Sequence, residues 1–154
     1  MKKGDQLKLS NQICFPIYSV SRLITKAYKP FLSELGITYP QYLVLLVLWE
    51  KDKQTVNDIS KKLILNSNTI SPLLKRMEKL QLIERNRSIK DERSVLVQLT
   101  EIGKKMRIKA LLIPEKLIEA LATDKIKFED ITKLKDLLCV WMSVLSDSKD
   151  SDTF

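Results

Sequence analysis

Apolar residues recur with a helical period over most of the chain. Residues 9–35 show this period and predict one long or broken helix, which ends at Gly36. The segment "TYPQYLVLLVLWE" predicts a second helix, with Thr38 and Pro40 as start signals. This second helix is apolar on nearly all sides, so we expect it to be buried.

The next segment has the pattern of a helix-turn-helix. In "TVNDISKKL", Thr55 and Asp58 resemble a capping box at the start of a short helix. In "NSNTISPLLKRMEKLQ", a cluster of capping residues opens a longer helix over residues 68–81, with an apolar stripe on one side. A short helix, a tight turn and a longer helix predict a helix-turn-helix, with the longer helix as its recognition helix.

After the recognition helix the period changes to that of strands. Two β-prone runs, residues 82–85 and 94–99, flank a charged connection and predict a β-hairpin with a basic tip, called a wing. Thr100 then caps a helix that is interrupted at Pro114, and residues 127–147 predict the last helix. The expected fold class is mainly α with a small β-hairpin wing, a winged helix-turn-helix.

Composition and charge restrict the function. The formal net charge is +8, and the stretch from Lys75 to Lys109 holds eleven Lys or Arg but only five Asp or Glu. This local excess suits a surface that binds a polyanion. The chain has no histidine and only two cysteines, 125 positions apart, so we expect neither a zinc site nor histidine-based catalysis, and no cofactor. No run of about 18 uncharged apolar residues occurs, which predicts a soluble, cytoplasmic chain without a membrane segment.

The recognition helix and the wing supply a candidate DNA interface. Short polar side chains at the start of the helix suit base contacts, and the basic side chains that follow suit phosphates. On the helix the candidates are Asn68, Thr69, Ser71, Pro72, Lys75, Arg76 and Lys79. On the wing they are Arg85, Arg87, Lys90, Asp91 and Arg93. Asp91 can hold the Arg93 guanidinium in one orientation for a narrow minor groove, although an exposed surface ion pair is the alternative.

Several motifs are shared with a known family. They are "NQICF", "AYKPFL", "ITYPQYLVLLVLWE" and "SNTISPLLKRMEKLQLIERNRSIKDERSVLVQLTEIGK". With these motifs the chain resembles, over about residues 9–147, the MarR family of winged-helix regulators and its organic-hydroperoxide-sensing, OhrR-like branch. The resemblance implies a single MarR-type chain over residues 1–154, with dimerisation helices at about 9–36 and 101–147 and a DNA-binding region at about 38–100. It also implies an obligate-type homodimer that binds a pseudo-palindromic operator in double-stranded DNA.

Cys14, in "LSNQICFPIYS", has two interpretations. By residue type, a cysteine in an apolar segment is more often buried filler than a sensor. The resemblance implies instead a redox-sensing thiol that organic hydroperoxides oxidise, hydrogen-bonded by Tyr28 and Tyr39 of the partner subunit. Tyr28 follows Cys14 by fourteen residues, about 21 Å along a continuous helix, so it cannot reach the sulfur of its own chain. Tyr18, one turn on, is a further neighbour. Pro16 stands where the family commonly has a helix-compatible residue, so the helix either begins near Cys14 or kinks there.

Cys139 lies on a flank of the last predicted helix, and we interpret it as a packing residue rather than a resolving thiol. Our hypothesis is a DNA-binding transcriptional repressor, not an enzyme, that senses organic hydroperoxides by oxidation of Cys14 and then releases its operator. Three alternatives stay open: a MarR-type repressor relieved by a small aromatic ligand, a thiol peroxidase, and a winged-helix protein-interaction module. The missing resolving CxxC pair and the absent histidine argue against peroxidase turnover.

Overall fold

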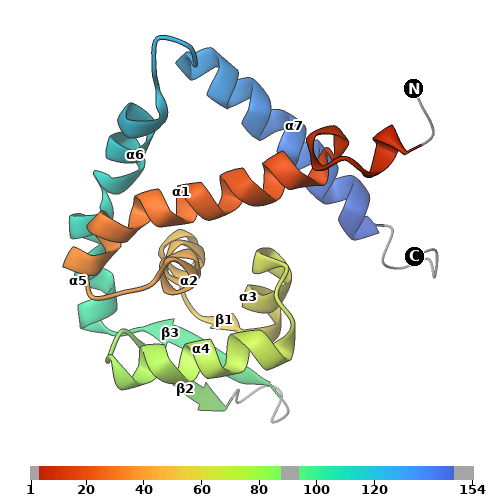
Figure 1. Cartoon of the computed structure of the whole chain (residues 1–154). Coiled ribbons are helices and arrows are strands. Elements are labelled where there is room, and N and C mark those ends of the chain that lie inside the picture. Colours follow the sequence, from red (N-terminus) through yellow and green to blue (C-terminus); the bar gives the residue numbers. More distant parts are fainter. Residues whose placement is uncertain (1–3, 88–93, 148–154) are drawn as a thin grey trace. The chain divides into compact units, whose positions relative to one another are not determined.

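The computed structural model describes residues 4–87 and 94–147, and it is mostly helical with one small sheet (Figure 1). The chain divides into two compact units, and the boundary along the sequence lies between Ile113 and Pro114. The first unit holds the helices α1 to α5 and the sheet, and the second holds nearly all of α6 and the whole of α7. The wing residues Lys90, Asp91 and Arg93 lie outside the described residues.

Helix α1, Cys14–Glu34, begins later than the predicted start at residue 9. Two short 3₁₀ turns, Asp5–Leu7 and Leu9–Asn11, precede it. Pro16 is the third residue of α1, where a backbone N–H has no partner inside the helix, so the proline fits the helix start rather than a kink. Gly36 ends α1 as predicted: its φ is 67°, and the N–H of Ile37 donates to the carbonyl of Leu32 at 3.1 Å.

The helix-turn-helix prediction is confirmed. Helix α2, Tyr39–Glu50, begins with a capping box in which the Thr38 N–H donates to the Gln41 side chain at 2.8 Å. Helix α3, Val56–Leu63, is capped by Thr55, whose hydroxyl oxygen accepts from the Asp58 N–H at 3.1 Å. Helix α4, Ser67–Lys79, follows after a turn of three residues and is the recognition helix.

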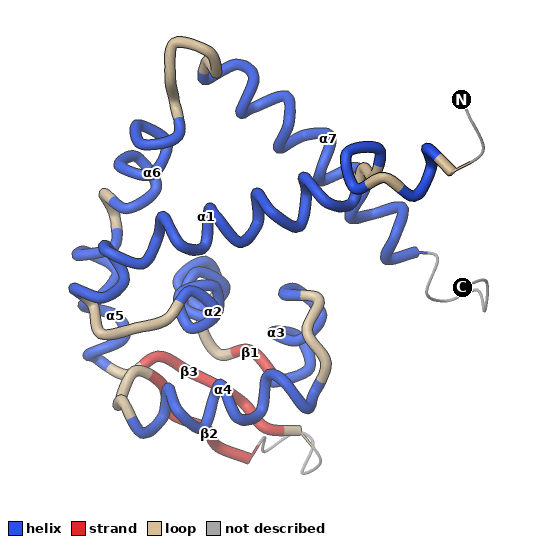
Figure 2. Tube along the Cα trace, in the orientation of Figure 1, coloured by secondary structure: helices blue, strands red, loops and turns tan. Residues whose placement is uncertain are grey.

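The wing prediction is also confirmed, with one strand more than expected (Figure 2). Strands β2, Ile83–Arg87, and β3, Val95–Leu99, pair antiparallel and form the hairpin. Strand β1, Gln54–Thr55, pairs with the other edge of β3 and gives the order β1-β3-β2. A segment of two residues is too short to show the alternating pattern of a strand, so the sequence pattern did not predict β1.

The helical segment after the wing is divided into two helices. Helix α5, Glu101–Ala110, is capped by Thr100, whose hydroxyl oxygen accepts from the Gly103 N–H at 3.1 Å. Helix α6, Ile113–Leu121, carries Pro114 as its second residue. Pro114 has no N–H to donate to the carbonyl of Ala110, so the break falls just before it. Helix α7, Phe128–Asp147, agrees with the predicted last helix.

The core of the first unit forms around α2. Tyr42, Val44, Leu45 and Leu48 of this helix are at most 1% exposed, which confirms that it is buried. The other large, fully buried side chains come from α1, α3, α4, β2 and β3; they are Leu32, Ile59, Ile70, Leu74, Met77, Ile83 and Val97. The recognition helix and the wing are therefore attached to α2 through one shared core.

Apolar side chains are also exposed on the first half of α1 and along α7. On α1 the exposed residues include Phe15, Ile17 and Leu23, and on α7 they include Leu134 and Trp141. In the part of the chain that the structure describes, no single helix is long and apolar enough to cross a membrane. Helices α1 and α2 meet that requirement only as a pair, with a bend of 74° at the break between them.

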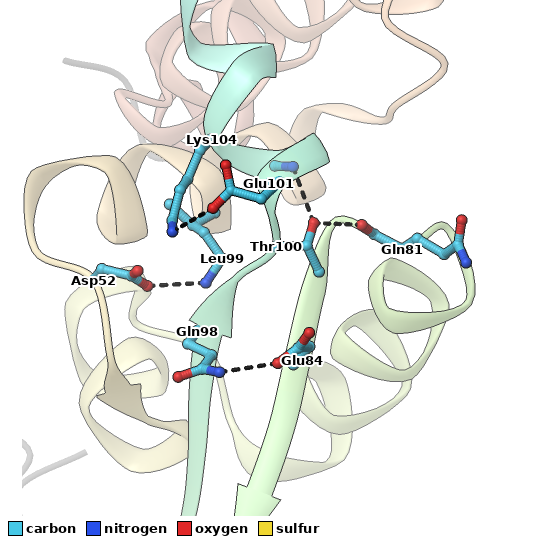
Figure 3. A network of polar contacts seen from close by, with 9 residues as sticks. Asp52, Gln81, Glu84, Gln98, Leu99, Thr100, Glu101 and Lys104 are labelled. Atoms are coloured by element: carbon cyan, nitrogen blue, oxygen red, sulfur yellow. Dashed lines mark hydrogen bonds and ion pairs between the residues drawn. The ribbon is translucent and has the colours of Figure 1, made fainter.

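Hydrogen bonds attach strand β3 and the start of α5 to neighbouring parts of the first unit, and Figure 3 shows several of them. The Asp52 carboxylate accepts from the Leu99 N–H at 2.9 Å, and the Thr100 hydroxyl donates to the carbonyl of Gln81 at 2.5 Å. The Trp49 indole N–H donates to the carbonyl of Gly103 at 2.9 Å. Gly103 also packs so closely that an added Cβ would lie 2.1 Å from the Leu82 carbonyl oxygen.

We predict that Gly103→Ala destabilises the protein. The new methyl group would have to push back the backbone of Leu82, and overpacking of this kind costs about 1–3 kcal/mol. Thermal unfolding measures the effect, with Lys105→Ala, an exposed position on the same helix, as the matched control. Equal melting temperatures for the two variants would contradict this prediction.

Candidate sulfur site and nucleic-acid interface

Cys14 is the first residue of α1 and is exposed in the single chain. The first N–H groups of a helix have no intrahelical partner, and the helix dipole places partial positive charge at this end. The late start of α1 thus places the Cys14 side chain beside these N–H groups.

Tyr18 lies one turn after Cys14, and its hydroxyl is already engaged. Arg22 Nη1 donates to the Tyr18 hydroxyl oxygen at 2.7 Å, and the guanidinium carbon lies 5.5 Å from the ring centroid. Because the oxygen accepts from Arg22, the hydroxyl proton remains available for a further acceptor. Tyr18 is exposed in the single chain. Its role as a neighbour of the sulfur stays a prediction.

Tyr28 and Tyr39 lie side by side in one chain. Tyr28 comes from the second half of α1 and Tyr39 is the first residue of α2; their ring centroids are 4.8 Å apart. Tyr42 extends the group, with its ring centroid 5.8 Å from that of Tyr28, and Trp49 follows at 6.2 Å from Tyr42. The turn at Gly36 sets α2 at a bend of 74° to α1 and so brings the two predicted tyrosines together.

The phenols of this group are held in their protonated form. Burial raises the pKa of Tyr28 to about 12, with smaller contributions from Tyr39 and Tyr42. Burial also raises the pKa of Tyr39 and of Tyr42 above the ordinary value. At neutral pH these groups are therefore hydrogen-bond donors, as a partner for a thiolate has to be.

The sulfur and the tyrosine pair do not meet within one chain. Helix α1 runs without interruption from Cys14 to Tyr28, and fourteen residues of α-helix span about 21 Å. No hydrogen bond between the two groups of the same chain is compatible with that separation.

A groove opens beside Tyr39, between residues 21–33 of α1 and residues 37–40. Its volume is about 730 Å³. Leu32 and Ile37 supply apolar surface, and Arg22 and Lys26 supply positive charge. Sequence reasoning missed this groove, because it depends on how α1 and α2 pack and not on any local motif.

The recognition helix α4 presents the predicted side chains on its outer face. Ile70, Leu73, Leu74 and Met77 are buried on the inner face. Ser71 is half-buried, and the other predicted residues are exposed; these are Asn68, Thr69, Pro72, Lys75, Arg76 and Lys79. The outer face is thus polar at its start and basic further along, as a DNA-reading helix requires.

Asn66 positions the start of α4. Its side-chain oxygen accepts from the Thr69 N–H at 3.0 Å and from the Thr69 hydroxyl at 2.9 Å. The Thr69 hydroxyl is therefore tied into the helix cap, while Asn68 and Ser71 beside it project from the helix start.

On the wing, the two described arginines, Arg85 and Arg87, have different environments. Arg87 is exposed at the end of β2. Arg85 is engaged: its Nη2 lies 2.7 Å and its Nε 3.0 Å from Oε2 of Glu78, on α4. Sequence reasoning missed Glu78 as a functional residue, and no local pattern links it to a residue seven positions later.

Cys139 lies within α7 and is exposed. It belongs to the second unit, whereas Cys14 belongs to the first. Both thiols are free.

Comparison with known proteins assigns the family. Residues 26–110 match the family model described as "Transcriptional regulator SarA/Rot". The organic hydroperoxide resistance transcriptional regulator of Bacillus subtilis is 48% identical over 143 residues, which cover 93% of this chain and 95% of that protein. The chain belongs to the MarR family of winged-helix regulators, in its organic-hydroperoxide-sensing branch.

Solved structures of MarR-type proteins agree with this assignment. Reduced AbfR bound to DNA, from Staphylococcus epidermidis, has a TM-score of 0.74 and 36% identity, covering 93% of this chain and 99% of that one. Overoxidised AbfR bound to DNA has a TM-score of 0.72 and 37% identity, with coverages of 92% and 98%. MarR of E. coli in its apo form has a TM-score of 0.67 and 25% identity, with coverages of 82% and 93%.

We predict that Tyr28 stays protonated at pH 10 in the folded protein. An ordinary tyrosine is half ionised there, but burial raises the pKa of Tyr28 to about 12. Folded wild type and Tyr28→Phe should then show the same tyrosinate absorbance at pH 10, while in denaturant the wild type should show more.

The same shift has a consequence for stability. The unfolded chain gives up the Tyr28 proton first, so this group's contribution is complete below pH 10 and is lost as pH rises through about 12. The free energy of unfolding of the wild type should fall relative to Tyr28→Phe over this interval. A parallel course for the two proteins would contradict the assignment.

Proposed function

We propose that this protein is a DNA-binding transcriptional repressor that senses organic hydroperoxides by oxidation of Cys14 and then releases its operator. The observation that carries the proposal is the placement of Cys14 at the exposed start of α1, in a winged-helix chain that shares 48% identity with an organic hydroperoxide resistance regulator. Acting on the chromosome, the protein would work in the cytoplasm.

The DNA-binding part of the proposal rests on α4 and the wing. Asn68, Thr69, Ser71 and Pro72 would face base edges and nearby phosphates in the major groove. Lys75, Arg76 and Lys79 would neutralise phosphates. Arg87 would reach the minor groove together with Lys90 and Arg93, which lie outside the described residues. Asp91 would orient Arg93 there.

A homodimer is supported by the apolar side chains that the single chain leaves exposed. They lie on the first half of α1, where Phe15, Ile17 and Leu23 are exposed, and along α7. Large apolar side chains that gather in an exposed position on a helix mark an interaction site. We infer that a second copy covers it, which would place two recognition helices on a pseudo-palindromic operator.

The dimer also resolves the distance between Cys14 and the tyrosines. We infer that Tyr28 and Tyr39 of each subunit donate hydrogen bonds to the Cys14 sulfur of the partner. Their raised pKa values keep them as donors, and two phenol donors at a helix N-terminus would stabilise the thiolate.

The chemical step is oxidation of the thiolate by the hydroperoxide. The sulfur attacks the terminal peroxide oxygen, the S–O bond forms as the O–O bond breaks, and the organic part leaves as an alcohol after taking up a proton. The sulfenic acid can then condense with a small thiol and release water, which gives a mixed disulfide, or it can be oxidised further. Each sulfur consumes one hydroperoxide and then needs an external thiol to reduce it; as a sensor, the protein would react stoichiometrically and not turn over.

Cys14→Ser tests the sensing step. With a small thiol present, wild-type protein should release its operator after one equivalent of organic hydroperoxide per subunit, and Cys14→Ser should stay bound, because the hydroxyl is not oxidised. Operator binding followed by fluorescence anisotropy, with mass spectrometry of the sulfur, measures both events. Cys139→Ser is the matched control and should respond like the wild type.

Release of Cys14→Ser by the peroxide would overturn the sensing proposal. A Cys139→Ser variant that no longer responds would instead show a two-cysteine mechanism. The mass spectrum shows which oxidation product forms. Its identity matters, because overoxidised AbfR has been crystallised bound to DNA. We expect the mixed disulfide, the bulkier product, to cause release.

A mixed dimer tests the sharing of the site between subunits. One subunit carries Cys14→Ser and the other carries Tyr28→Phe together with Tyr39→Phe. If the tyrosines act on the partner's sulfur, this mixed dimer has one intact site and its remaining sulfur should be oxidised at the wild-type rate.

The homodimer of the double tyrosine variant should react at least about tenfold more slowly, since each of the two lost hydrogen bonds to a charged group contributes about 1.5–3 kcal/mol. Peroxide consumption in stopped flow measures both rates. An equally slow mixed dimer would contradict the shared site.

A further inference from the structure

Glu78 is an unexpected residue on a helix that approaches DNA. It lies in the last turn of α4, between the exposed cations Lys75 and Lys79. A carboxylate near DNA phosphates is repelled by them, and leaving it unpaired there would weaken binding. Its placement therefore needs a partner that neutralises it.

That partner is Arg85 of the wing. Two guanidinium nitrogens of Arg85, Nη2 and Nε, lie 2.7 and 3.0 Å from the same oxygen of Glu78. The Arg85 side chain is 23% exposed and that of Glu78 is 39% exposed. A half-buried arginine held by two hydrogen bonds has a defined position, in contrast to a freely moving surface lysine.

The strand alternation directs Arg85 toward α4. Arg85 shares its face of β2 with Ile83, which is buried, and it pairs with Val97 of β3, which is 0% exposed. Glu84 and Asn86, on the opposite face, are exposed. The Arg85 stem therefore lies along the core side of the wing, with its guanidinium at the end of the recognition helix.

We propose that the Glu78–Arg85 ion pair is a strut that sets the angle between the recognition helix and the wing, and that Arg85 is a positioning residue and not a phosphate contact. The inference rests on the proposed function as a DNA-binding regulator. It reassigns one arginine of the wing, and it leaves Arg87, Lys90 and Arg93 as the residues that approach DNA there.

A strut and a phosphate contact affect DNA binding differently. A helix and a wing that must enter two adjacent grooves together depend on their relative angle, so the strut contributes to the preference for the operator. A phosphate contact contributes equally to every sequence, and each one that is lost lowers the slope of log K against log salt by about 0.9. Specificity and salt slope therefore separate the two roles.

Glu78→Gln separates the two roles through the ratio of its affinities for two DNA duplexes. The probes are the tightest-binding duplex that wild-type protein selects from a randomised pool, and a scrambled duplex of the same length. With a strut, the ratio of the two affinities should fall roughly tenfold, comparable to one mismatched base pair. With a free phosphate-binding arginine, loss of the repelling carboxylate would strengthen binding to both duplexes and leave the ratio unchanged.

Glu78→Gln combined with Arg85→Gln removes the pair without changing the net charge. We expect this double variant to lose the same specificity while keeping the wild-type salt slope on the scrambled duplex. Lys79→Gln, one exposed cation on the same helix turn, is the comparator and should lower the slope by about 0.9. A slope that falls equally in the double variant would overturn the strut.

The outcomes also separate this proposal from the proposed function. A wild-type protein that selects no duplex would overturn both. A selective wild type whose Glu78→Gln variant binds both duplexes more tightly, with an unchanged ratio of affinities, would overturn the strut alone. Melting temperatures of the variants identify any loss of folding, and a double variant that melts early is replaced by Glu78→Gln, whose ratio of affinities decides the question by itself.

Discussion

Helix α2 has to be kept away from water, and the arrangement of the first unit follows from that constraint. Its apolar side chains point in nearly all directions, so no single neighbour can cover them. Helices α1, α3, α4 and α5 all contact it. The recognition helix is thereby attached to the same core as the turn that brings Tyr28 to Tyr39. Burial of one helix positions both the proposed DNA-reading surface and the proposed sulfur-binding tyrosines.

Much of this fold could be predicted from local patterns. The boundaries of α2, α3 and the wing follow from capping residues and from the change of period, because those signals act within a few residues of where they stand. The start of α1 was misjudged, since apolar residues before Cys14 continue the helical period although they form 3₁₀ turns. Strand β1 could not be predicted, because it exists only through its pairing with β3.

The candidate sites divide in the same way. The basic residues of α4 could be identified on a helical wheel, since one helix determines their face. Tyr28 and Tyr39 were linked to Cys14 only through the family resemblance, because their contact depends on tertiary packing and their proposed sulfur partner on a second chain. Arg85 was grouped with the other wing cations for its charge alone, and its engagement by Glu78 became visible only when α4 and β2 were placed together.

The length of α1 fixes the spacing of Cys14 and Tyr28. The same uninterrupted helix carries Cys14 at its start and Tyr28 fourteen residues later, so its geometry sets both the distance and the angle between them. One inserted residue would turn the sulfur by about 100° around the helix axis and move it by about 1.5 Å relative to the tyrosine. Substitutions on the exposed surface leave that relation intact, whereas any insertion or deletion between the two residues changes it. The proposed shared site therefore depends on the length of this stretch of α1 and not on the composition of its exposed surface.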